Sequence, residues 1–144
     1  MSFKSPLETM QTGQALAPVS ASSGAQNGNV IDMTDYEGIV FFLEVGAMTA
    51  TGTLDMKIQR AAVVAFSTPV DIAGAALTQI LAASGGSKVY AVDVPMPAMG
   101  FVRCVVTPAT AASVFGVTYQ QYGKRGKRGP TQAATQAVKV AQGL

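Results

Sequence analysis

Apolar and polar residues alternate without a break from Thr53 to Gln59. A period of two residues is typical of a strand that buries one face and exposes the other. The most apolar run of the chain extends from Glu37 to Val45, and both faces of a strand there would be largely apolar. We therefore expect this second strand in the centre of a sheet, and we expect Thr49 to Gly52 to join the two strands as a hairpin.

Further segments show a similar strand pattern: Val30–Met33, Lys88–Val94, Phe101–Thr107 and Ser113–Tyr122. The stretch 62–66 also suits a strand, which Pro69 would end, whereas 74–83 favours a short helix or an irregular crossing. Short strands that recur about every ten residues are typical of antiparallel sandwiches and barrels. The sequence therefore predicts an all-β fold, an antiparallel β-sandwich of jelly-roll-like form.

The alternation also predicts which side chains form the core. The expected core residues are Ile39, Phe41, Leu43, Leu54, Met56, Ile58, Val102, Cys104 and Val106. Because Cys104 falls on the apolar face of its strand, we expect a buried and unreactive thiol. It is the one cysteine of the chain, so an intramolecular disulfide is excluded.

The 144 residues are expected to form one domain with two extended terminal arms. Residues 1–29 are rich in Ser, Gly, Gln and Ala without a sustained period, which predicts an N-terminal arm that is ordered on a neighbour or not at all. Residues 30–123 would form the β-sandwich. Residues 124–144 would form a basic C-terminal arm, separated from the body near Pro130.

Charge is scarce and unevenly distributed. Charged residues make up 12% of the chain, against about 25% in ordinary soluble domains. Residues 1–123 carry five basic and eight acidic residues, whereas 124–144 carry five basic and no acidic ones. A weakly charged body indicates apolar surface that is covered by neighbours, so we expect a homo-oligomer, a dimer or a trimer. The apolar runs are much shorter than the ~20 residues that cross a bilayer, so no membrane partner is expected.

The sequence offers little for catalysis. It has no histidine, which excludes Ser-His-Asp and Cys-His relays and the usual zinc sites. The carboxylates that could form an acid–base pair are Asp32, Asp35, Glu37 and Glu44. They fall at strand ends and turns, where such residues normally cap turns or stay in solvent. We therefore expect a protein that is not an enzyme and that needs no cofactor or metal.

One dense charge motif is a candidate binding site. It consists of Lys124, Arg125, Lys127 and Arg128, interrupted by glycine. Four cations on a flexible segment suit an anionic partner such as an acidic protein surface, and a solvated basic loop is the alternative. Nucleic acid is the less favoured partner, because only Tyr119 and Tyr122 lie nearby to stack on bases.

The order of short motifs resembles a known class of proteins. Val30-Ile31-Asp32 precedes a tyrosine turn at Tyr36, the apolar strand, and a strand from Gly52-Thr53-Leu54 to Lys57-Ile58-Gln59. The segments Lys88–Asp93 and Phe101-Val102-Arg103 to Thr107 continue the pattern. Over roughly residues 30–122, this order resembles small structural proteins of tailed bacteriophages that accompany the major capsid protein.

The resemblance implies a capsid decoration or cement protein. Such a protein would be made in the host cytoplasm, bind the major capsid protein and stabilise the head from the outer capsid surface of the virion. Packaged DNA would not be accessible from there. Two alternatives stay open: another virion part, such as a head-completion or tail protein, and a β-sandwich module that binds a ligand or carbohydrate. The lack of tryptophan counts against a carbohydrate-binding module.

Overall fold

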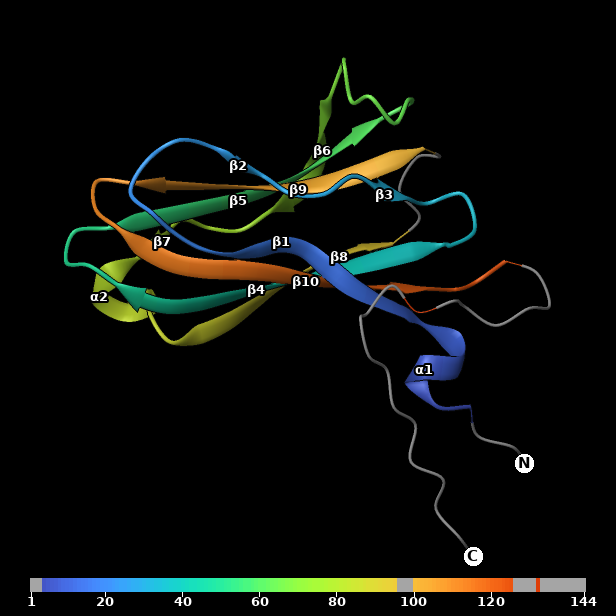
Figure 1. Cartoon of the computed structure of the whole chain (residues 1–144), viewed down its shortest axis with the longest axis horizontal. Helices are drawn as coiled ribbons and strands as arrows, with labels where there is room; N and C mark the ends of the chain where they lie inside the picture. The colour runs from blue at the N-terminus through green and yellow to red at the C-terminus, as the bar shows by residue number, and fades with distance from the viewer. Residues whose placement is uncertain (1–3, 96–99, 126–131, 133–144) are drawn as a thin grey trace, which may run out of the picture.

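A computed structural model describes residues 4–95, 100–125 and 132 of the chain. Its strands form two antiparallel sheets that lie one above the other as two layers (Figure 1). The predicted all-β fold of antiparallel strands is thereby confirmed. Two single-turn helices, α1 (Pro6–Thr9) and α2 (Ala82–Gly85), accompany the strands.

Sheet A has four strands in the order β1–β10–β4–β8, which are β1 (Gln11–Ala21), β10 (Ser113–Tyr122), β4 (Gly38–Met48) and β8 (Lys88–Pro95). Sheet B has the order β2–β9–β5–β6, which are β2 (Gln26–Asn27), β9 (Phe101–Ala109), β5 (Thr53–Ala61) and β6 (Val70–Ala76). Two short strands extend sheet B, because β3 (Ile31–Asp32) pairs with β9 and β7 (Ile80–Leu81) pairs with β5. The apolar strand β4 lies between β10 and β8, so its predicted central position is confirmed.

The strand pairs are nested in sequence. The first strand, β1, pairs with the last, β10, while β2 and β3 pair with β9. Inside these, β4 pairs with β8, and β5 pairs with β6 and β7. Two further pairings, β10 with β4 and β9 with β5, join the nested pairs into the two sheets. Most contacts that hold the body together therefore link residues far apart in the chain.

The core lies between the two sheets and contains every residue that the alternation predicted. All nine expected core side chains, including Leu43 of sheet A and Leu54 of sheet B, are at most 2% exposed. Phe115 and Val117 of β10 add to the same cluster. Since each sheet supplies one apolar face, burial of these faces against each other is the main stabilising contribution to the fold.

The predicted hairpin between β4 and β5 is wrong, because the two strands lie in different sheets. Their link turns sharply at Thr51, which has a φ of 70°, and the amide of Gly52 donates to the carbonyl of Thr49 at 2.9 Å. The chain thus passes from one layer to the other. Alternation determines which face of each strand is buried, but two strands with one apolar face each can pair side by side or pack face to face.

The body also begins earlier than residue 30. Residues 11–21, which the sequence assigns to an arm, form the edge strand β1, and β2 follows within the same predicted arm. Strand β1 was missed because its inward residues are small: Gly13 and Ala15 are buried, whereas Ala17 and Pro18 are exposed. Register shifts after Gln14 and Leu16 break the period of two. Such irregularities and an exposed proline are common on edge strands.

The strand predicted for residues 62–66 is wrong, and of the two alternatives predicted for residues 74–83, a short helix or an irregular crossing, the single helix is wrong. Residues 62–66 form bends and a turn in place of a strand, and Phe66 has a φ of 54°, which a strand does not accommodate. Residues 74–83 contain the end of β6, the short strand β7 and the start of α2 in place of one helix. Their alanines favour a helix in isolation, but pairing with β5 outweighs that weak preference.

Candidate partner-binding site

The basic motif follows β10 directly. The structure describes Lys124 and Arg125, while Lys127 and Arg128 lie outside the described residues. Gly123 separates the two cations from the strand and has a φ of 66°. A side chain at this position would place its Cβ 2.8 Å from the Cβ of Glu37, so both the backbone conformation and the available space favour glycine.

Backbone hydrogen bonds fix the start of the motif against the turn between β3 and β4. The amide of Glu37 donates to the carbonyls of Tyr122 and Gly123, at 3.1 and 3.2 Å. The amide of Arg125 donates to the carbonyl of Asp35 at 2.8 Å. The positions of both described cations are therefore set by a turn that lies about ninety residues earlier in the chain.

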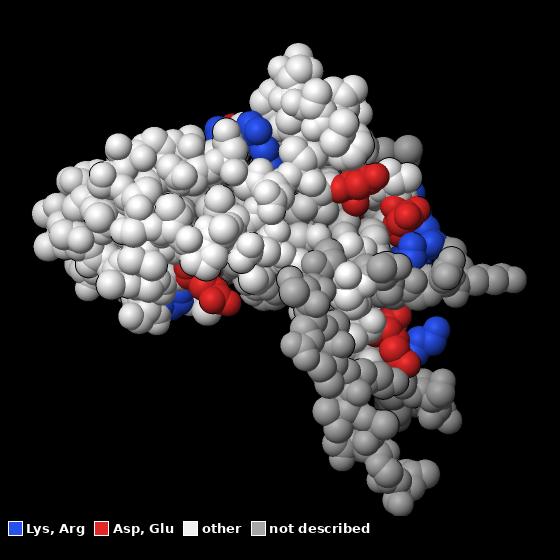
Figure 2. All heavy atoms as spheres, viewed as in Figure 1, with Lys and Arg blue, Asp and Glu red and all other residues white. Residues whose placement is uncertain are grey.

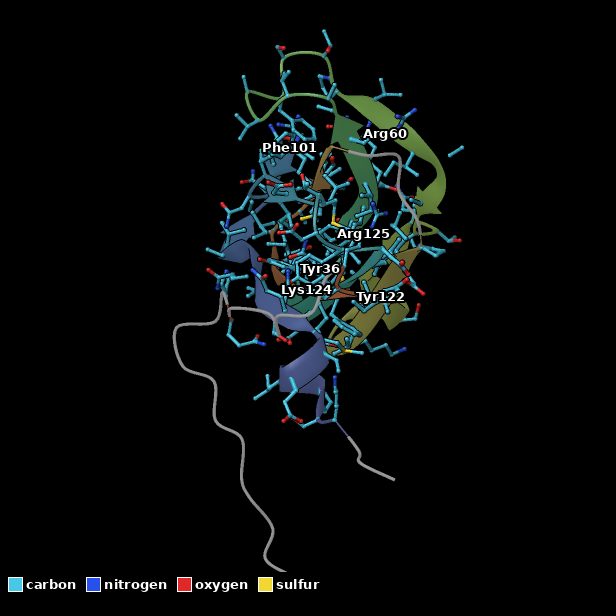
Figure 3. The ribbon with its side chains drawn as sticks, turned by 90° about the vertical axis from the view of Figure 1, so that its right-hand side faces the viewer. Tyr36, Arg60, Phe101, Tyr122, Lys124 and Arg125 are labelled. Carbon is cyan, nitrogen blue, oxygen red and sulfur yellow. The ribbon has the colours of Figure 1, made fainter. Side chains whose placement is uncertain are left out.

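The two described cations have different surroundings. The Lys124 Nζ lies 3.8 Å from Asp35 Oδ2 and 5.2 Å from the centroid of the Tyr36 ring, and its side chain is only 20% exposed. Because the Asp35 side chain is 69% exposed, this ion pair contributes only about 0–1 kcal/mol. Arg125 is exposed, and Figure 3 shows both cations at the same end of the body as Tyr36 and Tyr122.

Two tyrosines support this end of the body. The Tyr36 hydroxyl donates to Gln11 Oε1 at 2.7 Å, and burial together with the nearby Asp35 raises the pKa of Tyr36. The Tyr122 hydroxyl donates to Asp93 Oδ1 at 2.6 Å, and burial and this carboxylate raise the pKa of Tyr122 to about 12. Both phenols therefore stay protonated at neutral pH and act as hydrogen-bond donors.

Three exposed acidic side chains lie on the segment that holds the two cations. They are Asp32 at the end of β3 and Asp35 and Glu37 on the β3–β4 turn. Asp32 Oδ1 accepts from the amide and the hydroxyl of Thr34, at 2.9 and 2.6 Å, which is the turn-capping role expected for this residue. Figure 2 shows a few separate groups of charge, with broad uncharged areas between them on the face in view. The cations thus lie in a locally mixed electrostatic environment.

A contact that no sequence pattern indicates links Gln132 to the N-terminal part of the chain. The Gln132 amide oxygen accepts from the backbone amide of Thr12 at 3.0 Å. Its amide nitrogen donates to the carbonyls of Leu7 and Met10, at 2.9 and 2.7 Å. One side chain thereby satisfies three backbone groups at the junction of α1 and β1. Contacts across 120 residues between an amide side chain and main-chain atoms leave no local pattern in the sequence.

The described residues add neither a reactive thiol nor a cluster of metal ligands. Cys104 is buried as predicted, and burial raises the pKa of its thiol to about 12. Among residues 4–95, 100–125 and 132, no three Cys, Asp or Glu side chains gather to hold a metal ion. None of the helices in the described part of the chain is long and apolar enough to cross a membrane.

Comparison of the sequence with known proteins gives no family: no protein-family model matches it, and no curated protein matches it either.

Proposed function

We propose that this protein is a non-enzymatic structural component of a tailed-bacteriophage virion, a decoration or cement protein that binds the major capsid protein on the outer surface of the head. The observation that carries the proposal is the nested strand pairing. In a long antiparallel hairpin, the first strand pairs with the last, the second strand pairs with the one before the last, and this order continues towards the middle. Rolling that hairpin up then brings β10 beside β4 and β9 beside β5.

This connectivity supports a jelly-roll β-sandwich, an architecture of viral capsid domains and of lectins. The bacteriophage reading combines that architecture with the motif order Val30-Ile31-Asp32, Tyr36 and Gly52-Thr53-Leu54. The weakly charged surface and the terminal segments also fit a protein that is assembled into a larger particle.

The mechanism that follows is mechanical. Shell subunits are held together by many weak contacts, and a cement protein adds buried area across the joints between them. A terminal segment that contacts a neighbouring subunit would strengthen this binding, because the second contact of a tethered segment forms at high effective concentration. Arg125 and the cations that follow it would meet an acidic surface of the shell protein or of a neighbouring copy.

A carbohydrate-binding module is the second candidate, because lectins share the jelly-roll architecture. The outer face of sheet B carries a groove of about 350 Å³ whose polar lining residues are Asp55, Lys57 and Thr107. The groove residues in the described structure include no aromatic ring on which a sugar could stack. This favours the structural role, and a glycan array probed with the purified protein separates the two candidates.

The direct test uses empty shells assembled without this chain. Purified protein is added, and both its cosedimentation with the shells and the temperature at which the shells disrupt are measured. We expect saturable binding and a higher disruption temperature. Shells that neither bind the protein nor gain thermal stability would contradict a cement role.

A further inference from the structure

The link between β5 and β6 forms an apolar projection. Residues 62–69, called here the β5–β6 loop, contain no charged residue and extend beyond the sheet (Figure 1). Val63 and Val64 are 48% and 66% exposed, and Val70 at the end of the loop is 54% exposed. Clustered apolar side chains on a projecting segment are typical of a surface that contacts another protein.

The β5–β6 loop is held in a defined shape. Phe66 is buried against the body with a φ of 54°, and its amide donates to the carbonyl of Val63 at 3.0 Å. The guanidinium of Arg103 lies 4.4 Å from the centroid of the Phe66 ring. Arg103 itself donates to Gln59 Oε1 at 3.0 and 3.2 Å. A loop fixed in this way loses little conformational entropy when it docks.

An apolar groove lies on the opposite layer. It has a volume of about 270 Å³ on the outer face of sheet A, between β1, β10 and β4. Leu16, Pro18 and Val114 are among its apolar lining residues, and Gln14, Glu44 and Thr118 are its polar ones. Pro18 packs over Gly116, where an added Cβ would lie 3.2 Å from the Pro18 Cα, so an incoming apolar side chain would contact Leu16, Pro18 and Val114.

The charges beside the two features are complementary. Arg60 is exposed at the foot of the β5–β6 loop (Figure 3), and Glu44 is exposed at the groove. The ion pairs of the described residues involve neither of them. The groove opens away from sheet B, so a loop that extends from sheet B cannot enter the groove of its own chain. The matching surface is then offered by a second copy.

We propose that the β5–β6 loop of one copy docks in the sheet A groove of a second copy, with Val63 and Val64 against Leu16, Pro18 and Val114 and with Arg60 beside Glu44. The contact is heterologous, since each copy gives a loop and receives one, and it generates a ring if the rotation closes. This inference rests on the proposed function for the expectation that copies of the protein associate, and it adds the two surfaces through which they do so.

The test measures self-association of the purified full-length protein by analytical ultracentrifugation over a range of concentrations, with no shells present. Val64→Asp in the loop and Val114→Asp in the groove should each raise the dissociation constant by about tenfold or more, because each buries an unpaired charge. Leu81→Asp is the matched control: Leu81 is 50% exposed but belongs to neither surface, so its dissociation constant should not change.

Mixing the two variants gives the sharper result. A Val64→Asp copy keeps a good groove and a Val114→Asp copy keeps a good loop, so the mixture should form one-to-one complexes that grow no further. Likewise, Arg60→Glu and Glu44→Arg should each weaken association, and the double variant should restore it.

A wild-type protein that stays monomeric would overturn the inference, as would variants that associate like the wild type. If Val114→Asp loses binding to shells but keeps self-association, the groove binds the shell protein and the inference is wrong. Because no shells enter the association assay, its failure leaves the proposed virion role to its own test.

Discussion

The ammonium group of Lys124 lies over the ring of Tyr36, with its Nζ 5.2 Å from the ring centroid. Tyr36 is in turn fixed by its hydrogen bond to Gln11 on the edge strand β1. Lys124 is thus part of the packing that joins β1, the β3–β4 turn and the end of β10. Arg125, one residue later, has its backbone fixed by the same turn but an exposed side chain. The cations of the basic motif are therefore not equivalent.

Replacing Lys124, Arg125, Lys127 and Arg128 together by glutamine should weaken binding to empty shells. Because exposed charges act through a screened field, we expect about a tenfold loss of affinity at low ionic strength and little difference at high salt. Cosedimentation at two salt concentrations measures this. Lys124→Gln alone should have a smaller effect than Arg125→Gln, since Lys124 is already paired with Asp35. A quadruple variant that binds like the wild type at low salt would mean that the basic motif is a solvated loop without a role in binding.

Truncation of Leu54 tests the core. Leu54 is fully buried between the sheets, so Leu54→Ala should lower the free energy of unfolding by roughly 2–5 kcal/mol. Leu81→Ala removes the same atoms from a half-exposed position and should cost less than about 0.5 kcal/mol. Urea denaturation monitored by circular dichroism gives both values. Equal losses in the two variants would show that the buried face of β5 has been assigned wrongly.

The raised pKa of Tyr122, which comes from burial and from its hydrogen bond to Asp93, predicts a loss of stability at alkaline pH. The unfolded chain releases the Tyr122 proton near the ordinary pKa of about 10, whereas the folded protein holds it to a pKa of about 12. The stabilisation from this group is therefore complete below pH 10 and is lost as the pH rises toward 12. The difference in unfolding free energy between wild type and Tyr122→Phe should shrink over this interval. Other titrating groups are common to both proteins, so their contributions largely cancel in this difference. A difference in unfolding free energy that does not change with pH would contradict the raised pKa of Tyr122.

The link between the chain ends is testable at one amide. Gln132→Ala removes the acceptor of the Thr12 amide, so hydrogen exchange at Thr12 should become faster while exchange in β4 and β5 stays unchanged. Gln132→Glu is the matched variant, since it keeps an acceptor for Thr12 but loses the donors to Leu7 and Met10. Unchanged protection of Thr12 in the alanine variant would mean that the contact does not persist in solution.

The sequence predicted the buried faces well, because burial in a two-layer β fold is encoded locally. Ile39 to Leu43 and Leu54 to Ile58 alternate with polar or outward residues, and all their inward side chains are in the core. Strand β10 was predicted with the bounds that the structure has. Strand β1 was not predicted, because small residues such as Ala15 give an edge strand little apolar signal.

The strand partners and the neighbours of the basic motif could not be predicted from local sequence patterns. Which strand lies beside β4 depends on nested pairing between segments far apart in the chain, such as Gln11 with Gln121. The basic motif was visible as a run of charge, but its neighbours Asp35 and Tyr36 come from a turn far away in sequence. Similarly, nothing local shows that Phe66 folds back beneath Arg103 to fix an exposed loop.

The central claim is that this protein is a structural part of a virus particle. The most direct measurement is quantitative mass spectrometry of purified particles together with the lysate from which they came. The account predicts that the chain copurifies with the particles in a fixed, high ratio to the major capsid protein, corresponding to hundreds of copies. A chain that is abundant in the lysate but absent from the purified particles would contradict it.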